Sequence, residues 1–416
     1  MSQQNLPVAH ADVVSALIAI QHSIYQSPFE RTETLSKWTG KQVYLKLENL
    51  QMTGSFKERG ALNRLLKLRP EERSRGVITA SAGNHAQGVA FHATRLGIRS
   101  TIVMPETTPL IKVVSTRELG GDVILHGTSY DDAYAHACNL CEERALVFVH
   151  PFDDPAVIAG QGTIGLEMQQ QVPDIEAVVV PVGGGGLISG IAVAMKESNP
   201  RVTVIGVEAE AFPSMQASIQ AGTITSIRGG HHTIADGIAT KRVGDNTFAI
   251  VQKYVDEVVT VSEEEIANAI LILIEREKSV VEGAGATTLA ALINNRFHTD
   301  ARKIGLVLSG GNIDVNMVSD IIERGLVKDG RRIRLQIILP DVPGALHRVA
   351  GIICECRANI IQVHHDREFS DAPIGQAELH LTLETRGDEH IREIVSALKD
   401  RGYPVKRNTA ALNDSE

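Results

Sequence analysis

The sequence predicts an α/β fold in which helices cover parallel sheets, followed by a small domain of another topology. Short runs rich in Val and Ile alternate with longer amphipathic stretches up to about residue 325. Strands that are apolar on both faces and alternate with helices are typical of parallel sheets between helical layers. After Gly325 this alternation stops and a different order of elements begins. The change indicates a separate C-terminal domain.

The apolar runs before Gly325 predict eight strands. They are Gln42–Leu47, Gly76–Ala80, Ser100–Met104, Asp122–Leu125, Leu146–Val149, Ala177–Val182, Val202–Val207 and Lys303–Leu308. Apolar residues with helical spacing predict helices between them. Examples are Asn84–Leu96, Pro109–Leu119 and Asp131–Ala145.

A charged segment, Lys328–Arg332, predicts a linker between the domains. The elements expected after it are a strand, a helix, two strands, a helix and a short strand. Their ranges are Ile333–Leu339, Gly344–Cys356, Asn359–Val363, Glu378–Leu383, His390–Arg401 and Tyr403–Lys406. This β-α-β-β-α-β order is the ferredoxin-like arrangement.

Composition and charge exclude several classes of protein. The 416 residues are 43% hydrophobic and 22% charged, which is ordinary for a globular protein. A net charge of -9 argues against nucleic-acid binding. There is no apolar run of membrane-spanning length and no secretory signal, so we expect a cytoplasmic protein without a membrane partner. The pair Cys138 and Cys141 has the spacing of redox or zinc sites, but we interpret it as part of one half-buried helix, and no metal site is expected.

Four consecutive glycines, Gly183 to Gly186, stand between an apolar strand and an apolar helix. Backbone N–H groups that converge at a helix N-terminus bind phosphate. The alternative is a plain glycine turn, but four glycines carry an entropic cost that ordinary turns avoid. The dinucleotide pattern G-x-G-x-x-G, with its ribose-binding acid about 20 residues later, is not matched. The loop therefore predicts a phosphate site.

Lys57 lies in the string Thr53–Gly60, beside a Gly-Ser turn and at a predicted helix start. A helix N-terminus lowers the proton affinity of a lysine, and a lysine of low pKa is what Schiff-base chemistry requires. Taken alone, the same pattern also describes a solvated surface lysine.

The string Ser81–Ala86 follows one predicted strand, and Leu308–Asn312 follows another. Ligands bind parallel sheets at these carboxyl ends of strands. Polar groups of the first string could hold a carboxylate, although a capping turn with Ser81 or Asn84 as N-cap is the alternative. In the second string, the hydroxyl of Ser309 could form a hydrogen bond with a ring nitrogen.

These four strings, in this order, resemble the fold-type II family of pyridoxal-phosphate enzymes. Within it they resemble the threonine dehydratase branch, which also includes serine dehydratase and serine racemase. The resemblance covers about residues 6–325. It implies two helix-covered parallel-sheet lobes within a catalytic domain of residues 1–327, with a smaller lobe of about 52–155 inserted in the larger one. It also implies pyridoxal 5'-phosphate as cofactor, a homo-oligomer (dimer or tetramer), and conversion of L-threonine to 2-oxobutanoate and ammonia.

Roles for individual residues follow from the same resemblance. It implies that Lys57 forms the Schiff base and acts as general base. Phe56 would pack beside the cofactor ring, Asn84 would contact the ring hydroxyl, and Glu282 and Ser309 would lie near the ring and its nitrogen. The phosphate is expected on Gly183, Gly184, Gly185, Gly186 and Leu187. The substrate carboxylate is expected on Ser81, Ala82, Gly83, Asn84 and His85.

The C-terminal domain, residues 333–416, resembles ACT domains. The signature region is Leu339–Leu346, followed by Ala358–Ile360. The resemblance implies that an amino acid, isoleucine or valine by preference, binds there and regulates the enzyme. The expected effector residues are Gly344, Ala345, Leu346, Asn359 and Ile360. A domain that serves only oligomerisation is the alternative.

Two positions depart from relatives in this family. Racemases carry a second serine, their second base, where this chain has Ala82, which argues against racemisation. Relatives that bind a divalent ion have an aspartate six residues after a strand-end glutamate, whereas Glu208 is followed there by Ser214. The remaining alternatives are a serine-preferring dehydratase, whose pocket would differ by the space of one methyl group, and a non-catalytic amino-acid sensor.

Overall fold

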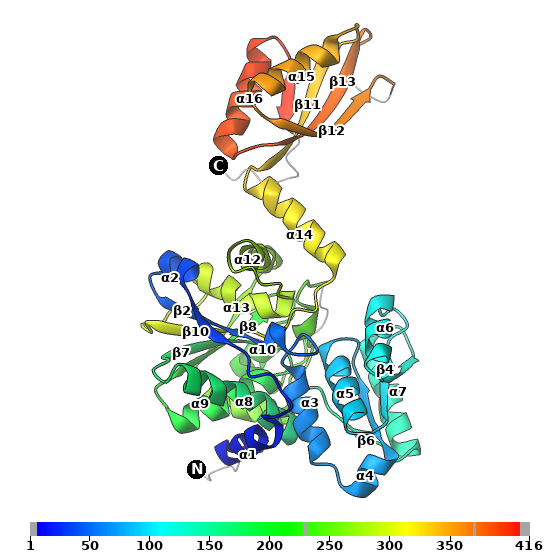
Figure 1. Ribbon diagram of the computed structural model, residues 1–416, viewed down its shortest axis with the longest axis vertical. Helices are drawn as coiled ribbons and strands as arrows, with labels where there is room; N and C mark the ends of the chain where they lie inside the picture. Colours follow the sequence, from blue (N-terminus) through cyan, green and yellow to red (C-terminus); the bar gives the residue numbers. More distant parts are fainter. Residues whose placement is uncertain (1–5, 228–231, 369–371, 408–416) are drawn as a thin grey trace. The chain divides into compact units, whose positions relative to one another are not determined.

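The apolar runs before residue 310 fold into two separate sheets (Figure 1). The larger sheet has the order β1-β2-β10-β7-β8-β9, and the smaller has the order β5-β4-β3-β6. The larger sheet contains β1 (Phe29–Thr32), β2 (Gln42–Leu47), β10 (Lys303–Leu308), β7 (Ala177–Pro181), β8 (Thr203–Ala209) and β9 (Glu257–Val261). The smaller contains β5 (Asp122–Leu125), β4 (Ser100–Met104), β3 (Val77–Ala80) and β6 (Val147–Phe148). All pairings are parallel except that of β1 with β2.

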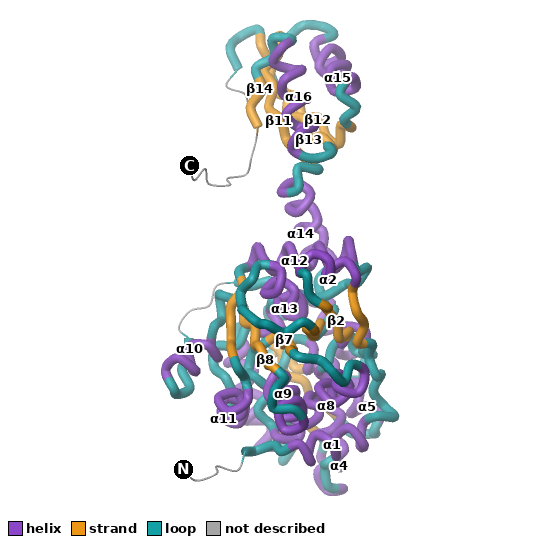
Figure 2. The backbone as a smooth tube through the Cα atoms, turned by 90° about the vertical axis from the view of Figure 1, so that its left-hand side faces the viewer, coloured by secondary structure: helices purple, strands orange, loops and turns teal. Residues whose placement is uncertain are grey.

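Helices fill the segments between the strands, so the predicted fold class is confirmed. From the N-terminus they are α1 (His10–Ile20), α2 (Glu33–Thr39), α3 (Lys57–Leu66), α4 (Pro70–Arg75), α5 (Asn84–Arg95), α6 (Leu110–Glu118), α7 (Tyr130–Glu143), α8 (Pro155–Gln171), α9 (Gly186–Ser198), α10 (Ser214–Ala221), α11 (Asp245–Tyr254), α12 (Glu263–Arg276) and α13 (Gly283–Ile293). Two short 3₁₀ helices, η1 (Glu48–Leu50) and η2 (Asp236–Ile238), lie in connecting segments. Helices α9 and α13 lie on opposite sides of β7 and β8 (Figure 2).

All eight predicted strands have an observed counterpart, but β1 and β9 were not predicted. Both are edge strands of the larger sheet. β1 buries only its first and last residues, Phe29 and Thr32, and β9 begins with the exposed Glu257. An edge strand lacks a neighbour on one side, so it carries a weaker apolar signal than a central strand.

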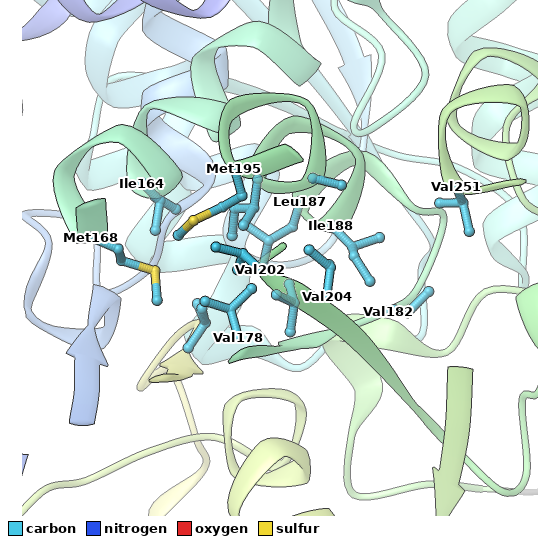
Figure 3. Close-up of a cluster of buried hydrophobic side chains, with 14 of the residues drawn as sticks. Ile164, Met168, Val178, Val182, Leu187, Ile188, Met195, Val202, Val204 and Val251 are labelled. Atoms are coloured by element: carbon cyan, nitrogen blue, oxygen red, sulfur yellow. The ribbon is translucent and has the colours of Figure 1, made fainter. Parts of the chain in front are cut away.

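A large hydrophobic core lies between this sheet and the helices α8, α9 and α11. Side chains from β7 and β8 meet those of the helices there, as Val178, Val204, Ile188 and Met195 show (Figure 3). This packing fixes the N-terminus of α9, and with it the glycine loop, against the carboxyl end of β7.

The computed structural model describes residues 6–227, 232–368 and 372–407; the last residues of the predicted C-terminal domain, 408–416, lie outside them. The chain divides into two units, Met1–Asp314 and Val315–Glu416. The second unit begins with α14 (Val315–Lys328), which precedes the predicted linker. No helix among the described residues is both long and apolar enough to cross a membrane.

After α14, the second unit consists of a four-stranded antiparallel sheet with two helices. Its order is β12-β13-β11-β14. The elements are β11 (Arg332–Pro340), α15 (Ala345–Glu355), β12 (Asn359–Asp366), β13 (Gln376–Glu384), α16 (Asp388–Asp400) and β14 (Val405–Arg407). Alternate residues such as Leu335, Ile337 and Leu381 form one core with Val349 and Ile394 of the helices. The element order and antiparallel pairing agree with the predicted ferredoxin-like arrangement.

Candidate active site

The four strings singled out in the sequence converge at the carboxyl ends of the strands of the two sheets. Ser81 follows β3, Gly183 follows β7 and Ser309 follows β10, while Lys57 begins α3. A single backbone bridge, Ser55 with Gly310, joins the lysine string to the segment after β10. The N–H of Phe56 donates to the carbonyl of Ser309 over 3.0 Å.

Lys57 is an amine held in a partly closed environment. Its Nζ donates to the carbonyl of Pro151 over 3.0 Å and lies 5.2 Å from the ring centre of Phe56. Burial lowers the pKa of Lys57 to about 8, although the carboxylate of Glu282 opposes that shift. A neutral, nucleophilic amine is therefore available near neutral pH, unlike in a solvated lysine.

The glycine loop forms a tight cradle at the N-terminus of α9. Gly185 is the N-cap residue and has φ of 96°, a left-handed conformation that favours glycine. A Cβ on Gly184 would lie 2.4 Å from the ring of Phe152, and one on Gly183 would lie 3.0 Å from Cα of Ile238. Leu187, the second residue of α9, is buried. Only a backbone without side chains fits here, and the first N–H groups of α9 have no acceptor within the helix.

Three polar side chains join the strings on the other side of the site. The amide Nδ2 of Asn84 donates to both carboxylate oxygens of Glu282, at 2.8 and 3.0 Å. Its Oδ1 accepts a hydrogen bond of 2.7 Å from Nδ2 of Asn312. The Asn312 amide also donates to the carbonyl of Thr53 over 2.8 Å. This network connects α5, the turn before α13 and the loop after β10.

Glu282 is buried and titrates in an unusual range. Burial raises the pKa of its carboxyl group to about 7, although the hydrogen bonds from Asn84 partly oppose the shift. Its backbone N–H donates to the carbonyl of Gly310 over 2.9 Å. A carboxyl group that titrates near neutral pH beside a lysine of low pKa is a common feature of enzyme active sites.

The predicted substrate loop lies beside this network. Ser81, Ala82, Gly83 and Asn84 are half-buried, and Gly83, not Ser81 or Asn84, is the N-cap residue of α5. The capping interpretation is therefore wrong. The imidazole of His85 is buried, with Nε2 3.0 Å from the carbonyl of Val149. Burial lowers the pKa of His85 to about 3, so its ring is neutral.

Ser309 is buried at the end of β10, one residue before Gly310. A Cβ at Gly310 would lie 2.5 Å from a carboxylate oxygen of Glu282, so the backbone of Gly310 passes close to that acid. The structure thus brings together the lysine string, the asparagine loop, Glu282 and Ser309.

One segment of the site, residues 150–154, was not predicted from the sequence. It supplies the carbonyl of Pro151 to Lys57 and the ring of Phe152 to the glycine loop. The carboxylate of Asp153 accepts N–H bonds of 3.0, 2.9 and 3.2 Å from the first residues of α11. The available signal was its position directly after a predicted strand. The strings that contain Ser81, Gly183 and Ser309 have the same position relative to their strands.

Glu208 has a structural partner that the sequence did not indicate. Its buried carboxylate accepts the N–H groups of Met215 and Gln216, at 2.7 and 2.9 Å, at the start of α10. Burial raises the pKa of Glu208 to about 8, and these hydrogen bonds oppose the shift. Among the described residues, no group of three or more His, Cys, Asp or Glu is arranged to hold a metal ion.

The predicted effector residues lie at two ends of the C-terminal sheet. Gly344, Ala345 and Leu346 line a cavity of about 470 Å³, together with His365 and Arg367. Asn359 and Ile360 do not line it: they begin β12, whereas His365 lies near its end.

The residues of the first unit fit pyridoxal phosphate. The glycine cradle at the start of α9 suits a phosphate dianion, and a Cβ at Gly183, Gly184 or Gly185 would collide with residues packed against the loop. Lys57 offers a low-pKa amine for the aldehyde. The neutral Ser309 is close to the Asn84–Glu282 pair through Gly310.

Comparisons with known proteins agree with this fit. A family model described as pyridoxal-phosphate dependent enzyme matches residues 20–310, and the chain belongs to that family. Within the family, the chain is 51% identical to L-threonine ammonia-lyase of Thermotoga maritima, over 95% of this chain and 98% of the relative. It is 54% identical to L-threonine ammonia-lyase of Geobacter sulfurreducens, over 89% of this chain and 92% of the relative.

Solved structures show the same likeness. The processed form of threonine deaminase isoform 2 from Solanum lycopersicum superposes with a TM-score of 0.71 at 41% identity, over 77% of this chain and 90% of that one. Serine racemase from Dictyostelium discoideum superposes with a TM-score of 0.70 at 37% identity, over 74% of this chain and 100% of that one.

Proposed function

We propose that this chain is a pyridoxal-phosphate-dependent ammonia-lyase that converts L-threonine to 2-oxobutanoate and ammonia. The observation that carries the proposal is the low-pKa Lys57 beside the glycine cradle, in a chain more than half identical to two L-threonine ammonia-lyases over most of its length. In the net reaction ammonia is lost, because the water eliminated from threonine is taken up again when the imine product is hydrolysed.

Each group of residues in the site would have a distinct role in the reaction. When bound, pyridoxal phosphate withdraws electrons from the substrate Cα and so acidifies its proton. Lys57 would bond to the cofactor aldehyde and, when released as a free amine, take the Cα proton. The N-terminus of α9, with Gly183–Leu187, would hold the phosphate. Phe56, Asn84, Glu282 and Ser309 would surround the ring.

The half-buried Ser81–Asn84 loop would bind the substrate carboxylate, with His85 contributing its backbone because its imidazole is bound to Val149. Position 82 is an alanine, so it offers no acid or base to the opposite face of Cα. This observation favours elimination over racemisation. L-Serine, which lacks one methyl group, should also react, because a methyl in an apolar pocket contributes only about 1–3 kcal/mol.

The C-terminal unit, in this proposal, binds an amino acid in the cavity lined by Gly344, Ala345 and Leu346. Arg367, which forms an ion pair of 3.1 Å with Asp341, and His365 lie in its wall, and the guanidinium would bind the carboxylate of the amino acid. We further infer a homo-oligomer: on the edge strand β12, Ile361 and Val363 are 47% and 46% exposed, and a second chain would cover them.

The test is an assay of the purified protein for 2-oxo-acid release from threonine, serine and 3-hydroxyaspartate. We expect threonine to give the highest kcat/KM. Cofactor-loaded protein that releases no 2-oxobutanoate would overturn the proposed function.

A further inference from the structure

Behind the glycine loop lies a buried side chain that no sequence motif indicated, Thr247 of α11. It is fully buried, and its Oγ1 donates to the carbonyl of Gly184 over 2.7 Å. The carbonyl of Gly244 lies farther from the same hydroxyl, at 3.1 Å, and already accepts the N–H of Phe248 over 3.0 Å. We therefore assign the carbonyl of Gly184 as the main acceptor of the Thr247 hydroxyl.

This hydrogen bond sets the direction of a neighbouring N–H group. The carbonyl of Gly184 and the N–H of Gly185 are parts of one peptide plane, and the described residues contain no cis peptide. In a trans peptide these two groups point in opposite directions. Because Thr247 holds the carbonyl toward α11, the Gly185 N–H is turned to the other side of the loop.

Packing restrains the same peptide from further directions. A Cβ on Gly185 would lie 2.8 Å from both Cβ and Oγ1 of Thr247, and 2.7 Å from the methyl group of Met215. The ring of Phe152 packs against Gly184, where a Cβ would lie 2.4 Å from it. The Gly184 carbonyl also accepts the N–H of Gly244, at a longer 3.3 Å.

The position of Thr247 is itself fixed by an acid from the 150–154 segment. Its backbone N–H, like those of Asp245 and Asn246, donates to the carboxylate of Asp153. An acidic group at a helix N-terminus is stabilised by the helix dipole. Thr247 therefore contacts Gly184 from the N-terminus of α11, and Asp153 holds that N-terminus. Asp153 belongs to the same segment as Pro151, which accepts the hydrogen bond from Lys57.

We propose that Thr247 is a positioning residue for the phosphate of the cofactor: its hydroxyl turns the Gly184–Gly185 peptide so that the Gly185 N–H faces the phosphate. The proposal rests on pyridoxal phosphate being the cofactor of the proposed function. Without the hydroxyl, the carbonyl would keep the longer hydrogen bond from the Gly244 N–H and would rotate more readily toward the phosphate, where its oxygen would repel the anion.

The test compares two forms of the ligand on stripped protein. Dissociation constants for pyridoxal phosphate and for pyridoxal, which lacks the phosphate, are measured from the visible absorbance of the bound ligand. Thr247→Val removes the hydroxyl at nearly constant shape, Thr247→Ala removes it without branching, and Thr247→Ser keeps it. Thr116→Val is the control, because Thr116 is also buried with its hydroxyl on a helix carbonyl, in α6.

We expect Thr247→Val and Thr247→Ala to weaken pyridoxal phosphate about tenfold, as for the loss of one hydrogen bond to a group that stays buried. Pyridoxal should be affected less than about twofold, and inorganic phosphate should compete with the cofactor less well than in the parent protein. Thr247→Ser and Thr116→Val should bind both ligands as the parent protein does.

Equal weakening of both ligands, no weakening of either, or a Thr247→Ser variant that behaves like Thr247→Val would overturn the proposal. Should Thr247→Val not fold, the Thr247→Ala and Thr247→Ser pair decides it. Protein that shows the expected pattern but does not deaminate threonine would refute the proposed function and leave this inference intact.

Discussion

A buried network of four charged side chains stabilises α3, the helix that begins with Lys57. Removing one of these charges tests how much the network contributes to stability. Lys46, Glu48, Arg59 and Glu167 are all buried. Arg59 binds Glu48 through Nε and Nη2, both at 2.8 Å, and binds Glu167 through Nη1 and Nη2, at 2.6 and 2.9 Å. Lys46 Nζ lies 2.7 Å from Glu167. Two positive and two negative charges therefore balance.

The perturbation is Glu167→Gln, which keeps the shape of the side chain but leaves one positive charge uncompensated. Removing one partner of a buried ion pair costs about 3–5 kcal/mol. For a unit of this size roughly 2 °C is lost per kcal/mol, so the melting temperature should fall by about 6–10 °C. Burial already lowers the pKa of Lys46, and losing a carboxylate would lower it further.

The pH dependence follows from that shift. When the pKa of a lysine is lower in the folded than in the unfolded protein, the unfolded state binds more protons between the two values, so stability rises with pH there. The deficit of Glu167→Gln should therefore shrink as the solution is made alkaline. The assay is thermal loss of the visible absorbance of the bound cofactor, which reports the first unit.

The matched control is the double variant Lys46→Met with Glu167→Leu. It removes one charge of each sign and leaves Arg59 paired with Glu48, so it should be more stable than Glu167→Gln. If Glu167→Gln melts within about 2 °C of the parent protein, or the double variant is the less stable of the two, charge balance does not hold α3 in place.

Four further predictions concern the site and the second unit. Lys57→Ala should abolish threonine turnover and the visible absorbance of the cofactor while leaving circular dichroism unchanged; near-normal 2-oxo-acid release would contradict its role. Because the pKa of Lys57 is lowered to about 8, capture of pyridoxal phosphate by stripped protein should accelerate as pH rises through about 8, whereas an acceleration centred above 10 would indicate an ordinary lysine. Gly184→Ala should prevent cofactor binding, since its Cβ would lie 2.4 Å from the ring of Phe152; spectra show this directly, and a normal cofactor content would disprove the tight cradle. Isothermal titration should detect isoleucine or valine on the full chain and not on Leu346→Asp, with threonine turnover retained; no binding to the parent chain would leave the second unit without the proposed effector role.

Much of the fold and the centre of the site could be predicted from the sequence, because local signals specify them. Strands such as Ser100–Met104 and Lys303–Leu308 are central and apolar on both faces, and the structure has them at the predicted residues. The glycine loop and Lys57 can be recognised from local sequence patterns: four glycines follow a strand, and a lysine stands at the start of a helix. The rule that parallel sheets bind ligands at the carboxyl ends of their strands then predicts that these strings meet.

Only the tertiary structure decided which groups touch. Asn84 and Glu282 are 198 positions apart, and Lys57 and Pro151 are 94 apart, so no local periodicity relates them. The same holds for Thr247 behind Gly184, and for His365 rather than Asn359 in the wall of the C-terminal cavity. Local patterns determine elements because neighbouring residues share backbone geometry, whereas contacts between elements depend on strand order and packing, which the chain settles only when it folds.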